Sequence, residues 1–145
     1  MIDISKVSTY QAGVYQSKAY RAFKDMKNSI LKKHGLTMAQ WSVLGFVYDA
    51  GRKGIRISDL AAKLDTTQAF ITNTVNNLEN KGMVKRIDHT TDGRTKLVVL
   101  EAKQKKVVSK IEVDIRAELR SKLYSKINRD ELETYINVLI RFAEV

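Results

Sequence analysis

Apolar residues recur at helical spacing along most of this chain. From about Val7 to His34 they stand four, seven and eight positions apart, which places them on one stripe of a long helix. The members of this stripe are Tyr15, Ala19, Ala22, Phe23, Met26 and Ile30. Val7, Tyr10 and Val14 extend the apolar surface beyond the stripe, so we expect a second subunit to cover part of this helix.

The same periodicity predicts further helices over about 38–50, 59–64, 67–81 and 101–126, and a last helix after Asn128. Five residues of the last helix are expected to form its buried stripe. They are Leu132, Tyr135, Ile136, Leu139 and Phe142.

Residues that favour helix ends support these boundaries. Thr37 and Gln40 have the spacing of a capping box, as do Asn128 and Glu131, and Ser58 is expected to cap the helix over 59–64. Gly35 and Gly82 are expected just beyond helix C-termini, where glycine tolerates a left-handed backbone.

A β-hairpin is predicted where the helical period is lost. Met83–Asp88 and Thr95–Leu100 read as strands, joined by a loop that contains Asp92 and Gly93. Ile55–Ile57 could form a third, short strand.

The helix over 59–64 is separated from the next one by only a few residues, which is the pattern of a helix-turn-helix. Followed by the hairpin, this pattern predicts a winged helix-turn-helix over 37–100. The expected fold class is α+β, mostly α with a small β-hairpin wing. The segments 1–36 and 101–145 are expected to form a helical dimerisation region. An intramolecular cap over the core remains the alternative.

The helix over 67–81 has two unlike faces. Ile71, Val75 and Leu78 share one stripe and are expected to be buried. The opposite side carries small, amide and hydroxyl side chains, which suit hydrogen bonding to base edges, and an Asn amide matches the N6/N7 edge of adenine. These outward residues are Ala69, Thr72, Asn73, Asn76 and Asn80.

The predicted hairpin carries four cations, Lys85, Arg86, Arg94 and Lys96. Arg94 adjoins its tip, and arginine is the side chain best suited to a narrow, electronegative minor groove.

Composition narrows the class of protein. A length of 145 residues with 43% apolar residues suits one folded domain, alone or with a dimerising extension, and the absence of proline suits a mostly helical chain. The net charge of +10 favours a polyanionic partner, either nucleic acid or an anionic membrane surface, although a merely solubilising charge is the simpler explanation at the chain ends.

Several kinds of chemistry are excluded or disfavoured. The chain has no cysteine, so it has no disulfide, thiolate metal site or thiol redox switch. It shows no Gly-rich phosphate loop and no paired His and carboxylate, and its two histidines are too few for a convincing metal site. We therefore expect neither an enzyme nor a cofactor. Without a signal peptide or an apolar run of membrane length, the protein is expected to be cytoplasmic.

At this point the chain resembles the MarR family of winged-helix regulators over nearly its whole length. The order of elements agrees, and so do local patterns of residues. These are Gly35-Leu36-Thr37 with Gln40 and Val43-Leu44, Leu60-Ala61 with Leu64, Leu78-Glu79 with Lys81-Gly82 and Val84, and Asp92-Gly93-Arg94.

The resemblance implies a homodimer on a palindromic operator, expected to act as a repressor, with helices in successive major grooves and wings in the flanking minor grooves. It assigns the major groove to Gln68, Thr72, Asn73, Asn76 and Asn77, and the minor groove to Arg94. Asp92, with Gly93, would be structural and orient Arg86 or Arg94. Thr67 and Gln68, at a helix N-terminus, would hold a phosphate, and the remaining double-stranded DNA contacts would come from Lys85, Arg86 and Lys96.

Two departures from the family pattern are visible. Asn73 stands where arginine is common, which favours hydrogen-bond readout over phosphate attraction at that position. After the wing, Leu100-Glu-Ala-Lys-Gln104 lacks the usual threonine cap.

The resemblance also implies a cleft for a small aromatic or anionic effector. Tyr15, Tyr20, His34 and Trp41 could line it, although aromatic residues at helical spacing more often belong to a core. Two other functions stay open. One is a sequence-indifferent architectural DNA-binding protein, and the other is a winged-helix adaptor between proteins.

Overall fold

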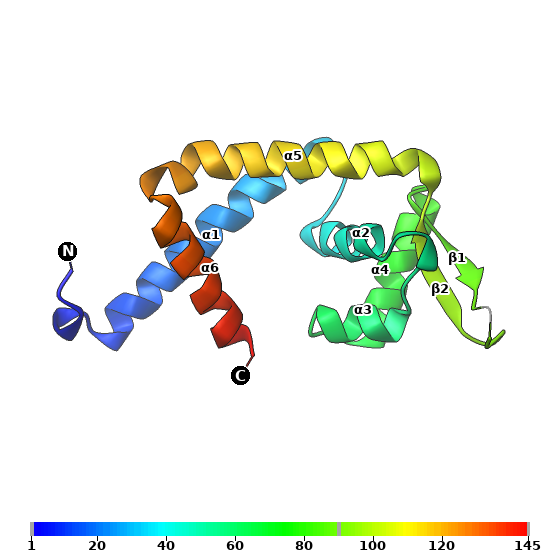
Figure 1. Ribbon diagram of the computed structural model, residues 1–145, viewed down its shortest axis with the longest axis horizontal. Coiled ribbons are helices and arrows are strands. Elements are labelled where there is room, and N and C mark those ends of the chain that lie inside the picture. Colours follow the sequence, from blue (N-terminus) through cyan, green and yellow to red (C-terminus); the bar gives the residue numbers. More distant parts are fainter. Residues whose placement is uncertain (1, 90, 145) are drawn as a thin grey trace. The chain divides into compact units, whose positions relative to one another are not determined.

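The computed structural model describes residues 2–89 and 91–144 (Figure 1). Three residues lie outside the described ones. Met1 and Val145 belong to the predicted dimerisation region, and Thr90 belongs to the predicted hairpin loop. The described helices and strands follow the predicted order. They are α1 Thr9–Lys33, α2 Met38–Ala50, α3 Ile57–Lys63, α4 Gln68–Asn80, β1 Val84–Asp88, β2 Lys96–Leu100, α5 Lys105–Lys122 and α6 Arg129–Ala143.

The chain forms two compact units. We call Lys27–Glu112 the winged unit, and Met1–Met26 with Val113–Val145 the flanking unit. The predicted winged core, 37–100, falls inside the winged unit, which also takes in the end of α1 and the start of α5. Among the described helices, none combines the length and apolar character that a bilayer crossing requires.

The core of the winged unit lies where α2, α3, α4 and the hairpin meet (Figure 1). Leu44, Leu60, Leu78 and Val98 are each fully buried. The predicted capping box of α2 is confirmed, because the backbone N–H of Gln40 donates to Thr37 Oγ1 and the N–H of Thr37 donates to Gln40 Oε1, both over 3.1 Å. This box fixes where α2 begins.

The segment before α3 differs from the prediction. Ile55 makes a single antiparallel bridge, with its N–H 3.0 Å from the carbonyl oxygen of Val98, and no third strand forms among the described residues. The helix begins at Ile57 after Arg56, so Ser58 lies inside α3 and is not its cap. The bridge explains the early start, because it ends at Ile55 and frees the chain to turn at once.

Gly54 lets this segment approach the hairpin closely. Its φ of 74° lies in the left-handed region, and a Cβ added there would meet Val99 Cγ1 at 2.9 Å. The hairpin itself is regular, with Val84 opposite Leu100 and Asp88 opposite Lys96. Any larger residue at position 54 would push β2 away from the segment that covers it.

The predicted helix over 101–126 is shorter in the structure. A 3-10 turn, Ala102–Gln104, precedes α5, and another, Tyr124–Lys126, follows it. Glu101 occupies the cap position of the first turn without a side-chain hydrogen bond. The missing threonine cap thus coincides with a tight turn in place of the first helical turn.

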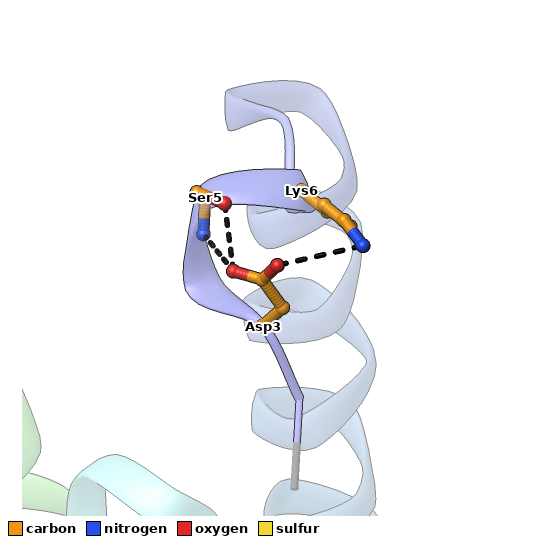
Figure 2. A network of polar contacts seen from close by, with 3 residues as sticks. All are labelled: Asp3, Ser5 and Lys6. Atoms are coloured by element: carbon orange, nitrogen blue, oxygen red, sulfur yellow. Dashed lines mark hydrogen bonds and ion pairs between the residues drawn. The ribbon is translucent and has the colours of Figure 1, made fainter.

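The chain start is also divided. Asp3 caps a 3-10 turn, Ile4–Lys6, by accepting from the N–H of Ser5 at 3.1 Å and from its hydroxyl at 2.7 Å, with Lys6 Nζ at 3.5 Å (Figure 2). The Ser5 hydroxyl and N–H hold the pKa of Asp3 below its usual range. Helix α1 begins only at Thr9, because Ser8 and Gln11 form a capping box that ends the preceding segment.

Aromatic contacts hold the flanking unit together. The ring of Phe23 on α1 lies 5.9 Å from that of Tyr124 and 6.1 Å from that of Tyr135 on α6. The capping box of Asn128 and Glu131 is confirmed. The expected buried stripe of α6 is not, since no described residue of this helix is buried and the exposed set includes Ile136, Leu139 and Phe142. The elements of one flanking unit are too few to cover both sides of α6.

Candidate nucleic-acid interface

Helix α4 has a buried face and an exposed polar face. Ile71, Val75 and Leu78 are buried as predicted, and Thr74 joins them by donating its hydroxyl to the carbonyl oxygen of Phe70 at 2.9 Å. The predicted major-groove residues are all exposed. They are Gln68, Thr72, Asn73, Asn76 and Asn77. Their amide and hydroxyl groups are therefore accessible to a partner.

The first turn of α4 is capped by Thr67, whose Oγ1 accepts from the N–H of Phe70 at 3.1 Å. Gln68 is the first helical residue, so both residues lie at the helix N-terminus as expected. The cap takes up one of the free N–H groups there. Phe70, which the sequence did not single out, exposes 47% of its surface beside this turn.

The other end of α4 is fixed by a glycine and a lysine. Gly82 has a φ of 70°, and the N–H of Met83 donates back to the carbonyl oxygen of Leu78 at 3.0 Å, which closes a Schellman motif. Lys81 Nζ donates to the carbonyl oxygen of Gly35 and, over 3.0 Å, to Gln40 Oε1. This lysine therefore joins the end of α4 to the start of α2.

Arg86 links the wing to the exposed face of α4. Its guanidinium pairs with Glu79, and its Nη2 donates to Asn76 Oδ1 over 2.8 Å. The side chain is only 25% exposed. The bond orients the Asn76 amide and occupies one lone pair of its oxygen, while the NH₂ group keeps its two donors. The guanidinium thus contacts two side chains of α4.

Asp92 holds the backbone of the wing. Its Oδ1 accepts from the N–H of Arg94 at 3.0 Å, and its Oδ2 accepts from the hydroxyl of Thr95 at 2.9 Å. These bonds, that from Arg94 above all, keep the pKa of Asp92 below its usual range. Asp92 therefore contacts Arg94, one of the two arginines that the resemblance named, through the backbone N–H of that residue. Gly93 and Arg94 are exposed.

The remaining wing cations differ in their surroundings. Lys85 is exposed, whereas Lys96 forms an ion pair with Asp88 across the hairpin. The Nδ1 atom of His89 lies 3.2 Å from the backbone nitrogen of Thr91, which donates to it. Neither the Lys96 pair nor the role of His89 follows from the motifs of the sequence, because both depend on the register of the hairpin and its loop.

A groove of about 640 Å³ lies beside the loop end of the hairpin. Arg52, Lys53 and Arg56 line it together with His89, and Arg56 Nη2 lies 3.4 Å from His89 Nε2. No sequence motif marks these three cations, because Arg52 and Lys53 stand on a turn and Arg56 stands at the cap position of α3.

The four residues of the predicted effector cleft come from both units. Tyr15 and Tyr20 belong to the flanking unit and expose 62% and 67% of their surfaces, while His34 and Trp41 belong to the winged unit. The cleft stays a prediction. Among the described residues, no cluster of His, Asp or Glu side chains could hold a metal ion.

A helix with an exposed amide-rich face, preceded by a short helix and followed by a cationic hairpin, defines a winged helix-turn-helix protein. Comparison with known proteins agrees. The MarR family model matches residues 34–95. The HTH-type transcriptional regulator MhqR of Bacillus subtilis (strain 168) is 28% identical over 125 residues, which cover 86% of this chain and 84% of MhqR.

Solved structures share the fold. A complex of S. aureus MepR with DNA matches with a TM-score of 0.77 at 22% identity, covering 96% of this chain and 98% of that one. CouR from Rhodococcus jostii RHA1, bound to p-coumaroyl-CoA, matches with a TM-score of 0.82 at 20% identity, covering 95% of each chain. The chain is therefore similar to the MarR family over residues 34–95, and it shares its fold with these solved structures.

Proposed function

We propose that this protein is a homodimeric repressor that binds a palindromic operator in double-stranded DNA and reads its sequence. The observation that carries the proposal is the exposed polar face of α4 beside the cationic wing, on a helix whose other face is buried. A net charge of +10 supports a polyanionic partner.

Each part of the interface has its own role. Thr72, Asn73, Asn76 and Asn77 contact base edges in the major groove, and Arg94 enters the adjacent minor groove. The Asn76 amide, held by Arg86 through its oxygen, presents its donors to acceptors such as N7 or O6 of guanine. This orientation favours donor contacts over the bidentate adenine pair.

Other groups position the protein on the backbone. The start of α4, at Thr67 and Gln68, suits a phosphate, and Lys85 and Lys96 add charge. Lys96 is the weaker contact, because Asp88 already neutralises it. Phe70 adds an apolar contact beside the first turn of α4, where a thymine methyl group fits its ring.

Dimerisation belongs to the flanking unit. Exposed apolar side chains lie on α1, at Tyr10 and Val14, and on α6, at Ile136, Leu139 and Ile140. Monomeric proteins rarely leave so many apolar residues in water, and a second copy of the chain would cover them.

A small aromatic or anionic effector releases the operator from this dimer. Tyr15 and Tyr20, which are exposed in the flanking unit, are its candidate contacts in this proposal. Support comes from the two exposed tyrosines and from CouR, a protein of the same fold that was solved with p-coumaroyl-CoA bound.

Selection of bound sequences from random duplex DNA tests the function. We expect an enriched palindrome whose half-sites lie about one helical turn apart, bound about a thousandfold more tightly than random duplex at moderate salt. A preference below about tenfold would identify an architectural DNA-binding protein instead. No duplex binding even at low salt would leave the adaptor function.

A further inference from the structure

The two ring nitrogens of His89, at the loop end of the hairpin, have different roles. Its Nδ1 accepts from the backbone N–H of Thr91 at 3.2 Å and from that of Asp92 at 3.3 Å. An imidazole nitrogen that accepts hydrogen bonds carries no proton, so the neutral ring has its proton on Nε2. His89 therefore orders the loop with one nitrogen and offers a hydrogen-bond donor at the other.

This donor faces a second donor. Arg56, which directly precedes α3, places its Nη2 3.4 Å from His89 Nε2. A guanidinium cannot accept a hydrogen bond, so the two groups cannot satisfy each other. Among residues 2–89 and 91–144, neither atom donates to an acceptor. Two converging N–H donors, one of them on a cation, suit a single anionic oxygen held between them.

The groove around this pair is positively charged. Arg52, Lys53 and Arg56 line it, and all three are exposed. Its acidic residues are Asp59 and Asp88, and Asp88 already has an ion-pair partner in the hairpin. In the part of the chain that the structure describes, only Asp59 therefore stands against three cations, which gives the groove a potential that attracts anions.

The pair also lies close to the proposed minor-groove contact. The N–H of His89 donates to the carbonyl oxygen of Thr95 at 3.0 Å, so His89 closes the same loop that carries Arg94. The minor groove of B-DNA is only about 6 Å wide. Phosphates border it on both sides, so a loop that enters it meets a backbone on each flank.

We propose that Arg56 and His89 together hold one phosphate of the DNA backbone, at the border of the minor groove that the wing enters. This inference rests on the proposed binding of double-stranded DNA. Because Arg56 precedes α3 and His89 follows β1, a single phosphate fixes the wing and the helix-turn-helix at once. The pair positions the protein and reads no base, since every nucleotide carries the same phosphate.

The first test measures affinity against salt concentration, for random duplex DNA and for the selected operator. Arg56→Met should weaken binding to both about fivefold and lower the slope of log affinity against log salt by about 1, because one phosphate contact is lost. Lys106→Met removes the same charge from an exposed position of α5 outside the groove and should leave the slope unchanged.

A second variant separates the donor of His89 from its role in the loop. In His89→Asn the amide oxygen replaces Nδ1 as the acceptor for the loop, whereas the shorter side chain lacks a donor at the position of Nε2. We expect a loss of duplex affinity of about threefold, with unchanged hydrogen exchange at the N–H of Thr91. The double variant should lose less than the product of the two single losses, because both contacts go to one phosphate.

Nitrogen NMR of the imidazole distinguishes DNA from free phosphate. Duplex DNA should shift the His89 Nε2 signal, and inorganic phosphate at about 1 mM should not saturate the shift, because a lone phosphate lacks the other contacts of the duplex. Saturation by inorganic phosphate with an unchanged duplex affinity in Arg56→Met would assign the pair to a free anion instead.

An unchanged salt slope in Arg56→Met, or single losses that multiply fully in the double variant, would also overturn the proposal. The wild type failing to bind any duplex would overturn it together with the proposed function. A sequence preference below about tenfold, with the slope still lowered in Arg56→Met, would support the phosphate contact and remove only the specific operator.

Discussion

At the scale of single residues, the wing and α4 share one polar network. Arg86 lies on β1, and both its partners, Glu79 and Asn76, lie on α4. A guanidinium that is mostly covered and doubly engaged holds its neighbours more firmly than an exposed lysine can. Arg86 is therefore expected to control how Asn76 meets DNA, although it makes no base contact itself.

Arg86→Met should relax base preference at the operator position that Asn76 reads, by about tenfold, because the amide loses the bond that orients it. Binding of operators with each base at that position measures the effect. Lys85→Met is the control, since Lys85 is exposed on the same strand. It should lower the salt dependence and leave base preference intact. Unchanged preference in Arg86→Met would refute the positioning role.

Asp92→Ala should free the backbone of the wing. The N–H of Arg94 then loses its carboxylate acceptor, and its hydrogen exchange at neutral pH should quicken severalfold with no change at buried amides of α4. The pKa of Asp92 is lowered, so its contribution is present above its ordinary value of 3.8 and is lost as the pH falls through the lowered value.

In the wild type, the hydrogen exchange rate of the Arg94 N–H, divided by the rate of an unprotected amide, should therefore rise only below the ordinary Asp92 pKa of 3.8. Protection that persists in Asp92→Ala would show that the carboxylate does not order the wing.

The proposed contact between Phe70 and a thymine methyl group can be tested by removing that methyl group from the DNA. Replacing operator thymines one at a time by deoxyuridine removes only a methyl group. If Phe70 packs on that group, one replacement should weaken wild-type binding about fourfold, as expected for a lost methyl contact of about 0.8 kcal/mol. Phe70→Ala should bind more weakly overall and lose its response to that replacement. An equal response in both proteins would exclude the contact.

At the scale of elements, caps decided which boundaries could be predicted. Thr37 and Asn128 each stand three residues before a Gln or Glu, and both boxes form. Ser8 and Gln11 have the same spacing and set the true start of α1. Ser58 has a good cap side chain but does not cap α3, because the bridge between Ile55 and Val98 fixes the chain three residues earlier. A backbone contact with a strand that is distant in sequence therefore overrides the local preference of a capping side chain.

Lys81→Met should destabilise the winged unit by about 1–2 kcal/mol. The change removes the donor to Gln40 Oε1 and to the carbonyl oxygen of Gly35, and Gln40 is buried. Urea unfolding measures the loss. Lys53→Met, an exposed lysine without these bonds, should stay within about 0.5 kcal/mol of the wild type. Equal stabilities of the two variants would contradict the joining role of Lys81.

At the scale of the molecule, the parts of the candidate site that depend on one helix could be predicted from the sequence. The parts that depend on contacts between different elements could not. The two faces of α4 follow from periodicity, so Asn73 and Asn76 could be placed from the sequence. The partners of Arg86 and Asp92 could not, because strand register and loop geometry determine them. The exposed Ile136 and Leu139 also escaped prediction, since a helical stripe does not tell which protein covers it.

Ile140→Glu should dissociate the dimer. Ile140 exposes 52% of its surface on α6, and a carboxylate buried there between two copies would be uncompensated. Sedimentation should show a folded monomer at micromolar concentration, with operator affinity reduced at least about a hundredfold. Asn137→Glu adds the same charge at an exposed polar position of α6 and should remain dimeric. A dimeric Ile140→Glu protein would move the interface elsewhere.

The Glu79–Arg86–Asn76 network also constrains how binding preference can diverge. A change at Asn76 alone leaves the Arg86 Nη2 donor without its acceptor, and a change at Glu79 leaves a mostly covered cation without its counter-charge. Substituting these three residues one at a time is therefore expected to destabilise the protein, whereas substituting them together can avoid that loss. Retargeting this protein to a new operator will need all three redesigned as a unit, whereas Asn73 and Thr72, which have no such ties among the described residues, can be varied freely.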